Sequence, residues 1–284
     1  MSHPIKTIAE VLAKVNDLPS LPTVAARINE ETDKESLTSK SLAGIISQDV
    51  SLVTRVLKLA NSAYYGMSRQ VDTIDHAVTI LGINTIKSLA MALSISGIFH
   101  DHHSDEIDMK GLWVHSLGCG VIARSLVAHS DQDLAEKAFL CGIIHDIGLI
   151  AIATIVPIEF AHTKELMNDF GVPQCEAEKQ ILGFSHAEMG GKMAEGWKFP
   201  EDYQEAIALH HCGKTNGSDH NSKILCNSVY LANKICKIKK LGVSVNPNYS
   251  KVSQSSLELV GINKDQMVRS TENAEADLHQ LLMV

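Results

Sequence analysis

The stretch Phe139–Ala161 reads FLCGIIHDIGLIAIATIVPIEFA and consists almost entirely of apolar residues. Its apolar run is interrupted at His145, Asp146, Pro157 and Glu159. The longest purely apolar pieces are therefore well short of the about 20 residues that cross the hydrocarbon core of a membrane. The stretch predicts a buried helix of a soluble protein in which a histidine and an aspartate are neighbours.

In the sequence before this stretch, apolar residues recur with the periodicity of helices. No proline occurs between Thr23 and Val156, and proline would break helix interiors. Apolar residues recur there at spacings of three and four, as at Leu42, Ile45, Ile46, Leu52, Val53, Val56, Leu57 and Ala60. This is the amphipathic helix period, and sustained β-branched alternation is nearly absent. We therefore expect an all-α, multi-helix fold.

Breaks in the helical pattern indicate where helices end. Gly82 is a candidate C-cap, and the next apolar face, Ile86–Ile95, ends before Gly97. The polar, histidine-rich segment His100–Glu106 is the clearest internal boundary. It separates two helical halves of the chain.

Three regions follow from these breaks. We expect an N-terminal helical half over residues 1–99 and a histidine-bearing helical half over residues 100–240. Residues 241–284 form a polar and helical extension, with an amphipathic segment at Ser255–Ile262 and an acidic stretch at Glu272–Val284.

The composition restricts the partners and the compartment. The chain has 284 residues, of which 25 are basic and 33 acidic, so its formal net charge is −8. Nucleic acid and anionic membrane surfaces attract a surplus of Lys and Arg, so we expect neither as a partner. The six cysteines never form a C-x-x-C motif and are predicted to be reduced, mostly buried thiols. No secretory signal is visible, which predicts a cytoplasmic protein.

His145 and Asp146 are the most informative pair of side chains. A carboxylate within an apolar helix is costly unless a cation, a metal or several hydrogen-bond donors partner it. Adjacent residues of a helix diverge by about 100°, yet both side chains can reach one metal ion between them. The alternative is that Asp146 caps or pairs internally while His145 is an ordinary core histidine.

Other histidines, among 14 in the chain, lie on separate predicted helical segments. His115 lies in an amphipathic helix, His186 follows the capping candidate Ser185, and the tandem His210-His211 closes an apolar run. Each one alone is more simply a core or surface histidine. Together with the central pair they form an ordered candidate metal site of the kind found in bundle cores: His115, His145, Asp146, His186, His210 and His211.

This order of H, HD, H and HH resembles the HD superfamily of metal-dependent phosphohydrolases. Upstream blocks resemble more specifically the HDOD family, the HD-related output domain of bacterial signalling proteins. These blocks are LPSLP at 18–22, IISQDVSL at 45–52, LKLANSAYYG at 57–66 and IDHAVTILG at 74–82. The resemblance covers about Val15 to Cys236. It implies an HD-like helical bundle with an additional N-terminal helical subdomain.

The sequence departs from the related enzymes at three places. The last metal ligand of the superfamily is usually an Asp, and the matching position holds Asn233, whose neutral amide is a poorer ligand for a hard cation. The G-Y-P element of the cyclic-di-GMP phosphodiesterases is missing after His211, and their additional Glu falls on Gly111. We therefore expect no hydrolysis of cyclic di-GMP.

Three weaker signals have simple structural interpretations. The His and Asp side chains of His100–Asp105 are one candidate for a surface metal site, but a solvated loop is the simpler interpretation because no rigid scaffold holds them. Tyr64 and Tyr65 are expected to pack the N-terminal helices, with ligand contact as the alternative. His76 belongs to the structural motif of the family that the chain resembles.

Two functions remain open from the sequence. The first is a bacterial signal-transduction module that acts by binding a signalling protein or a small nucleotide or phosphate ligand, with a metal as an optional component. The second is a metal-dependent phosphohydrolase of a nucleotide or another phosphate ester, in which Asp146 is the catalytic residue. The candidate ions are Fe, Mn, Zn and Ni. The sequence favours the binding module and leaves enzymatic activity undecided.

Overall fold

The structure is a computed structural model that describes residues 7–12, 19–62, 65–66, 70–213, 219–245 and 252–282. Throughout these ranges the regular structure is helical, without strands, which confirms the expected all-α class. The helices are α1 (Ile8–Leu12), α2 (Thr23–Asp33), α3 (Ser39–Ile46), α4 (Val50–Ala60), α5 (Ile74–Leu81), α6 (Ile83–Asp101), α7 (Met109–Val127), α8 (Gln132–Ile144), α9 (Ile147–Ile155), α10 (Pro157–Phe170), α11 (Gln174–Leu182), α12 (His186–Gly196), α13 (Glu201–Ala208), α14 (His220–Lys239), α15 (Gln254–Val260) and α16 (Lys264–Leu282).

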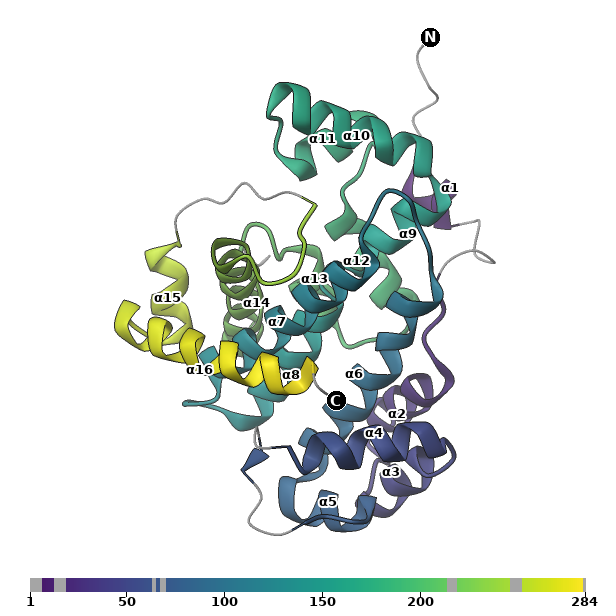
Figure 1. Ribbon diagram of the computed structural model, residues 1–284, viewed down its shortest axis with the longest axis vertical. Helices are drawn as coiled ribbons and strands as arrows, with labels where there is room; N and C mark the ends of the chain where they lie inside the picture. The colour runs from purple at the N-terminus through teal and green to yellow at the C-terminus, as the bar shows by residue number, and fades with distance from the viewer. Residues whose placement is uncertain are drawn as a thin grey trace.

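The helices are arranged along an elongated molecule (Figure 1). Helices α2 to α5 gather at one end, α10 and α11 lie at the other, and α15 and α16 lie along one side. Helix α6 packs against α2, α3, α4 and α5 as well as against α7 and α8. Because α6 contacts both groups, the buried apolar side chains form one core that extends from the N-terminal helices to α16.

The stretch Phe139–Ala161 is not one helix, which corrects the sequence prediction. Helix α8 ends at Ile144, α9 begins at Ile147, and Pro157 is the first residue of α10. His145 and Asp146 lie at the junction, where Asp146 leaves helical geometry with φ −98° and ψ 12°. The chain therefore bends at the two polar residues and presents both of them from a helix end.

Helix α6 is longer than the apolar pattern predicts. It continues through Gly97 to Asp101, so His100 and Asp101 belong to its last turn and the connection begins at His102. Gly97 has open space at its Cβ position, with only the Asp101 carboxylate within 4 Å. A single glycine inside a well-packed helix costs about 1 kcal/mol, which packing of the flanking apolar residues outweighs.

The most apolar part of the fold is interior rather than lipid-facing. The segment Gln132–Ile155 is long and apolar enough to span a membrane by length and composition, and 89% of its apolar window is buried inside the protein. Such burial is that of a core helix in a globular protein. The prediction of a buried stretch is confirmed.

Two close contacts between helix backbones set the positions of α7, α8, α9 and α12. A Cβ at Gly142 on α8 would lie 2.6 Å from Gly120 Cα on α7, and a Cβ at Gly148 on α9 would lie 2.1 Å from the His186 carbonyl oxygen. Only glycine allows backbones to approach this closely. These contacts bring the His145-Asp146 junction directly against the first turn of α12.

Candidate metal centre

All six predicted site residues meet between the helices, although each comes from a different local setting. His115 lies in the middle of α7, His145 and Asp146 form the α8–α9 junction, His186 is the first residue of α12, and His210 and His211 follow the end of α13. Grouping by ligand atoms places these residues in two overlapping clusters that share Asp146. Those clusters are His115, His145 and Asp146, and Asp146, His186, His210 and His211.

Local structure explains why His186 faces the centre. Ser185 caps α12: its side chain accepts from the Glu188 backbone N–H, and the Glu188 carboxylate in turn accepts from the Ser185 backbone N–H. From the sequence, only Ser185 was predicted to take part in this capping box. It fixes the start of the helix, so that His186 projects from the first turn.

The Asp146 carboxylate is the geometric middle of the cluster. Its Oδ2 lies 3.2 Å from His145 Nε2 and 3.7 Å from His115 Nε2. Its Oδ1 lies 3.4 Å from His186 Nε2 and 3.3 Å from His210 Nε2. Four imidazole nitrogens therefore converge on one buried carboxylate, two on each oxygen.

The other ring nitrogen of each of these histidines faces an acceptor. His145 Nδ1 lies 2.7 Å from the Gly142 carbonyl oxygen and His210 Nδ1 lies 2.7 Å from that of Ile207. His115 Nδ1 lies 3.3 Å from the Leu241 carbonyl oxygen. Hydrogen bonds from Nδ1–H leave the Nε2 lone pair free, which is the tautomer that a metal ligand needs.

His186 has a carboxylate in the same position. Its Nδ1 lies 2.6 Å from Glu178 Oε2 and 2.7 Å from Oε1, and Gln174 Nε2 donates to the same carboxylate at 2.9 Å. Both Glu178 and His186 are completely buried. Sequence reasoning missed Glu178, because the only local signal is an acidic residue on the apolar face of α11. A carboxylate behind a histidine raises the basicity of its other nitrogen.

The residues present fit a metal ion. The Nε2 atoms of His145 and His210 are buried and have no hydrogen-bond partner within the described chain. A buried polar atom without a partner is costly, and a cation between the four nitrogens and the carboxylate would satisfy both atoms at once. Imidazole with carboxylate is the ligand set that transition metals such as Zn, Fe, Mn and Ni accept.

Electrostatics keeps His115, His210 and Asp146 in the states that metal ligation requires. Burial lowers the pKa of His115 and of His210 to about 4, so both rings are neutral near pH 7. Burial opposes ionisation of Asp146, but the surrounding imidazoles, His145 first, outweigh it and hold its pKa well below the usual range. Metal ligation requires neutral imidazoles around an ionised carboxylate, so a bound ion would have to displace the proton that Glu178 and Asp146 stabilise on His186.

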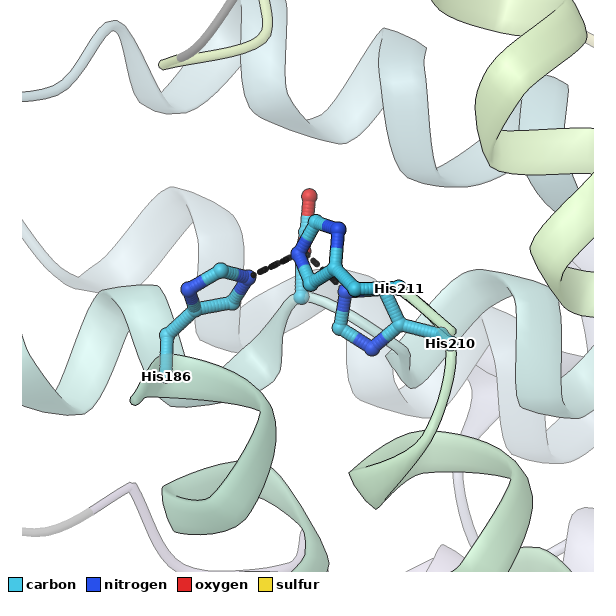
Figure 2. Close-up of side chains that lie close together, drawn as sticks. His186, His210 and His211 are labelled. Atoms are coloured by element: carbon cyan, nitrogen blue, oxygen red, sulfur yellow. Dashed lines mark hydrogen bonds and ion pairs between the residues drawn. The ribbon is translucent and has the colours of Figure 1, made fainter. Parts of the chain in front are cut away.

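His211 lies on the side of His186 that faces Asp146, and its ligand atom belongs to the same cluster as the Asp146 carboxylate. Its Nε2 lies 2.8 Å from His186 Nε2, the contact drawn as a dashed line in Figure 2, and the two rings are nearly perpendicular at 87°. Burial lowers the pKa of His211 well below its usual range. Since His186 Nε2 can serve one partner at a time, His211 either joins the ligand set or hydrogen-bonds to it.

Two thiols adjoin the centre and were not predicted to do so. Cys119 Sγ lies 3.6 Å from His115 Nε2, one helical turn away on α7, and Cys236 on α14 completes a third cluster of ligand-type atoms. Burial raises the pKa of the Cys119 thiol well above its usual value. All six cysteines are free thiols and four of them are buried, as the sequence predicted.

The positions that depart from the related enzymes are informative in the structure. A Cβ at Gly111 would lie 2.5 Å from Val243 Cγ2 and 2.6 Å from an Asp108 carboxylate oxygen, so no glutamate side chain fits there without a shift. Asn233 on α14 is buried, and its Oδ1 has no hydrogen-bond partner within the described chain.

The weaker candidates lie away from this centre. Within the described residues, the side chains of His100–Asp105 belong to no cluster of ligand-type atoms. His76 Nδ1 lies 3.8 Å from Asp72 Oδ1 near the surface. The Tyr65 hydroxyl accepts from Arg124 Nη1 at 3.3 Å, a packing contact with α7, and Tyr64 lies outside the described residues.

A helical fold in which histidines from α7, the end of α8, α12 and the end of α13 surround a buried aspartate defines a protein of the HD type. The chain belongs to the HDOD family, whose HDOD domain matches residues 18–212. The resemblance identified from the sequence is thereby confirmed.

Known proteins similar to this chain agree with this assignment. An HDOD domain protein from Geobacter sulfurreducens has the same fold, with a TM-score of 0.82, 23% identity and coverage of 98% of this chain and 97% of that one. A Shewanella amazonensis SB2B protein, named as a proposed phosphohydrolase, has a TM-score of 0.72 and 28% identity over 95% of this chain and 97% of its own.

One curated relative is longer than this chain. An uncharacterized protein of Treponema pallidum is 26% identical over 267 residues, which are 94% of this chain and 50% of that protein. The chain thus spans half the length of this relative.

Proposed function

We propose that this chain is an HDOD signal-transduction module that acts by binding, and that its His/Asp cluster holds a divalent transition metal. The observation that carries the proposal is the burial of the centre: His115, His145, His186 and His210 are 0% exposed and Asp146 is 4% exposed. Structural metal sites are closed, whereas catalytic sites keep a coordination position open to substrate. A closed centre is consistent with an ion that stabilises the fold or that acts in sensing.

The residues that would hold the ion are the four histidines through Nε2 and Asp146 through its carboxylate. When bound, such an ion lowers the pKa of a coordinated water and polarises phosphate oxygens. Glu178 holds His186 in the ligating tautomer, and the carbonyl oxygens of Gly142 and Ile207 do the same for His145 and His210. The protein therefore supplies a preorganised ligand set before any ion arrives.

Elemental analysis of the purified chain tests the metal. We expect a transition metal, Fe, Mn, Zn or Ni, in the wild type and its loss in His145→Ala and Asp146→Ala. The matched control is His129→Ala, an exposed histidine away from the centre. If the wild-type protein is metal-free and both site variants are as stable as the wild type, the metal part of the proposal is wrong.

Phosphohydrolase activity is the second candidate, and one observation favours it. The two oxygens of Asp146 face two different histidine pairs, so ligands for two ions would be available, His115 with His145 for one and His186 with His210 for the other. Two-ion sites stabilise the attacking and leaving oxygens of a phosphate ester, and Asp146 would then be the catalytic residue. The relative from Shewanella amazonensis carries the name of a proposed phosphohydrolase.

A substrate panel separates the two candidates. The metal-loaded protein is incubated with phosphomonoesters, phosphodiesters, nucleotides and cyclic dinucleotides. Turnover that Asp146→Ala abolishes, while His129→Ala leaves it unchanged, establishes the enzyme. The absence of turnover with every metal and ester leaves the binding module.

The partner of the module is a further part of the proposal. We propose a signalling protein or a small ligand in the cytoplasm, and neither nucleic acid nor a membrane, because the formal net charge of −8 gives no surplus of basic residues. A tagged wild-type chain is expected to retain a partner from cognate lysate. Repeated failure to retain any protein would count against a protein partner and leave the small ligand.

A further inference from the structure

A cavity separate from the metal centre lies where the N-terminal helices meet the histidine-bearing helices. It has a volume of about 410 Å³, which is within the range of small-molecule sites. Its walls come from α4, α6, α7, α8 and α16. The lining residues are Arg55, Leu59, Leu89, Ala92, Leu93, Ser96, His100, Lys110, Trp113, Val114, Leu117, Phe139, Leu281 and Leu282.

The cavity has an apolar body and a cationic edge. Most of its lining is aliphatic or aromatic, and the Trp113 ring is held by Phe99 at a centroid distance of 5.2 Å. The basic groups are Arg55, Lys110 and the imidazole of His100, and the last two are exposed. No Asp or Glu is present among the lining residues, so nothing in the wall neutralises these groups.

Arg55 is positioned to receive an anion. Its Nη1 donates to Ser96 Oγ at 3.3 Å, which holds the guanidinium against α6. Its Nε is buried and has no hydrogen-bond partner within the described chain. A buried guanidinium N–H without an acceptor is costly, and an oxyanion would satisfy it with a charge-assisted hydrogen bond.

Helix α7 separates this cavity from the metal centre. Trp113 and Leu117 line the cavity and lie two residues before and after His115. Two residues along a helix turn the side chain by about 200°, so the cavity and the metal centre lie on opposite faces of α7. None of the six candidate ligands lines the cavity, and a ligand there does not depend on a bound metal.

We propose that this cavity binds a small amphipathic anion, with an apolar body and a single carboxylate or phosphate head. The apolar lining takes the body, and Arg55 with Lys110 takes the head at the cationic edge. At about 30 Å³ for each water-sized group, the volume accommodates a ligand of about a dozen non-hydrogen atoms. Decanoate and octyl phosphate both have about this size, and they carry a carboxylate head and a phosphate head, respectively.

Tryptophan fluorescence tests the proposal with the full chain. The chain has two tryptophans, so Trp197→Phe leaves Trp113, directly in the cavity wall, as the only tryptophan. Chelator-treated protein is titrated with decanoate, octyl phosphate and the neutral 1-decanol. We expect saturable, one-to-one changes with at least one anion and binding of 1-decanol that is about tenfold weaker, the usual difference for a hydrogen bond to a charged group. The stronger of the two anions identifies the head group.

Variants in this background locate the site. We expect Arg55→Gln and Lys110→Gln each to weaken anion binding about tenfold while leaving 1-decanol unchanged. Ala92→Phe fills the cavity and should abolish binding of all three, with far-UV circular dichroism reporting whether it folds. Lys192→Gln, an exposed lysine on α12, is the matched control. The proposal is wrong if neither anion gives a saturable change in fluorescence. It is also wrong if 1-decanol binds as tightly as the anions and neither Arg55→Gln nor Lys110→Gln weakens anion binding. Both outcomes are independent of the metal analysis.

Discussion

Glu178 and His186 form a completely buried pair in which His186 Nδ1 lies 2.6 Å from the Glu178 carboxylate. Burial disfavours the charged imidazole, but Glu178 and Asp146 outweigh it and raise the pKa of His186 well above its usual value. The pair comes from two helices, α11 and α12, that are joined by a short connection. It sets the direction of the only ligand that α12 supplies.

The first prediction concerns this pair. Glu178→Gln keeps the shape of the side chain but removes the charge that orients His186 and makes its Nε2 basic. We expect metal affinity to fall by about 10- to 100-fold, as for other residues behind a metal ligand. Competition with a chromophoric chelator measures the change. Glu176→Gln, an exposed position two residues earlier, is the control, and equal affinity of the two variants would contradict the role given to Glu178.

The second prediction concerns the contact between α9 and α12. Gly148→Ala places a methyl group 2.1 Å from the His186 carbonyl oxygen, so the helices must separate. We expect a loss of about 3 kcal/mol in the free energy of unfolding. Gly44→Ala in α3 meets no atom within 4 Å and should instead stabilise by about 0.5–1 kcal/mol. Urea unfolding measures both, and a neutral Gly148→Ala would show that the backbones are not in contact.

The third prediction concerns the ion pair of Arg124 with Glu136. The Arg124 Nη2–Glu136 Oε1 distance is 2.7 Å, and Thr85 on α6 donates to the same carboxylate oxygen at 3.2 Å. Arg124→Met leaves a buried carboxylate without its cation and should cost about 3–5 kcal/mol. Because the cost arises from the stranded charge, the double variant Arg124→Met/Glu136→Leu should regain at least about 1 kcal/mol. If thermal unfolding finds the double variant no more stable than the single one, the charge is not the cause.

The fourth prediction concerns pH. Burial, with the nearby Lys137, lowers the pKa of Lys87. The unfolded chain therefore holds this proton up to a higher pH than the folded chain, so the contribution of Lys87 to stability rises as pH increases from its folded pKa to 10.5. Lys87→Met should stabilise the protein by about 0.5–1 kcal/mol at neutral pH. The stabilisation by Lys87→Met should become smaller in alkaline buffer. A stabilisation that instead increases with pH would contradict the lowered pKa of Lys87.

The all-α class was predictable because helical periodicity is a local property. The spacing of Leu52, Val56 and Leu59 encodes one buried face of α4 without reference to any other segment. Within the polar and helical extension predicted for residues 241–284, no apolar face was assigned to the acidic stretch Glu272–Val284. Its described part belongs to α16, whose Thr271, Ala274, Leu278 and Leu281 are buried against the rest of the fold. Sparse apolar residues become a helix face only when another surface covers them.

The sequence by itself determined the helical class, the family and the six residues of the candidate centre, because each depends on residue type and on order along the chain. Tertiary structure alone decided that Asp146 lies between four imidazoles and that Glu178 lies behind His186. It also decided that α7 separates the centre from a cavity with Arg55 at its edge. These relationships join helices distant in sequence, and their distances depend on packing, such as the backbone contact at Gly148, that no local pattern encodes.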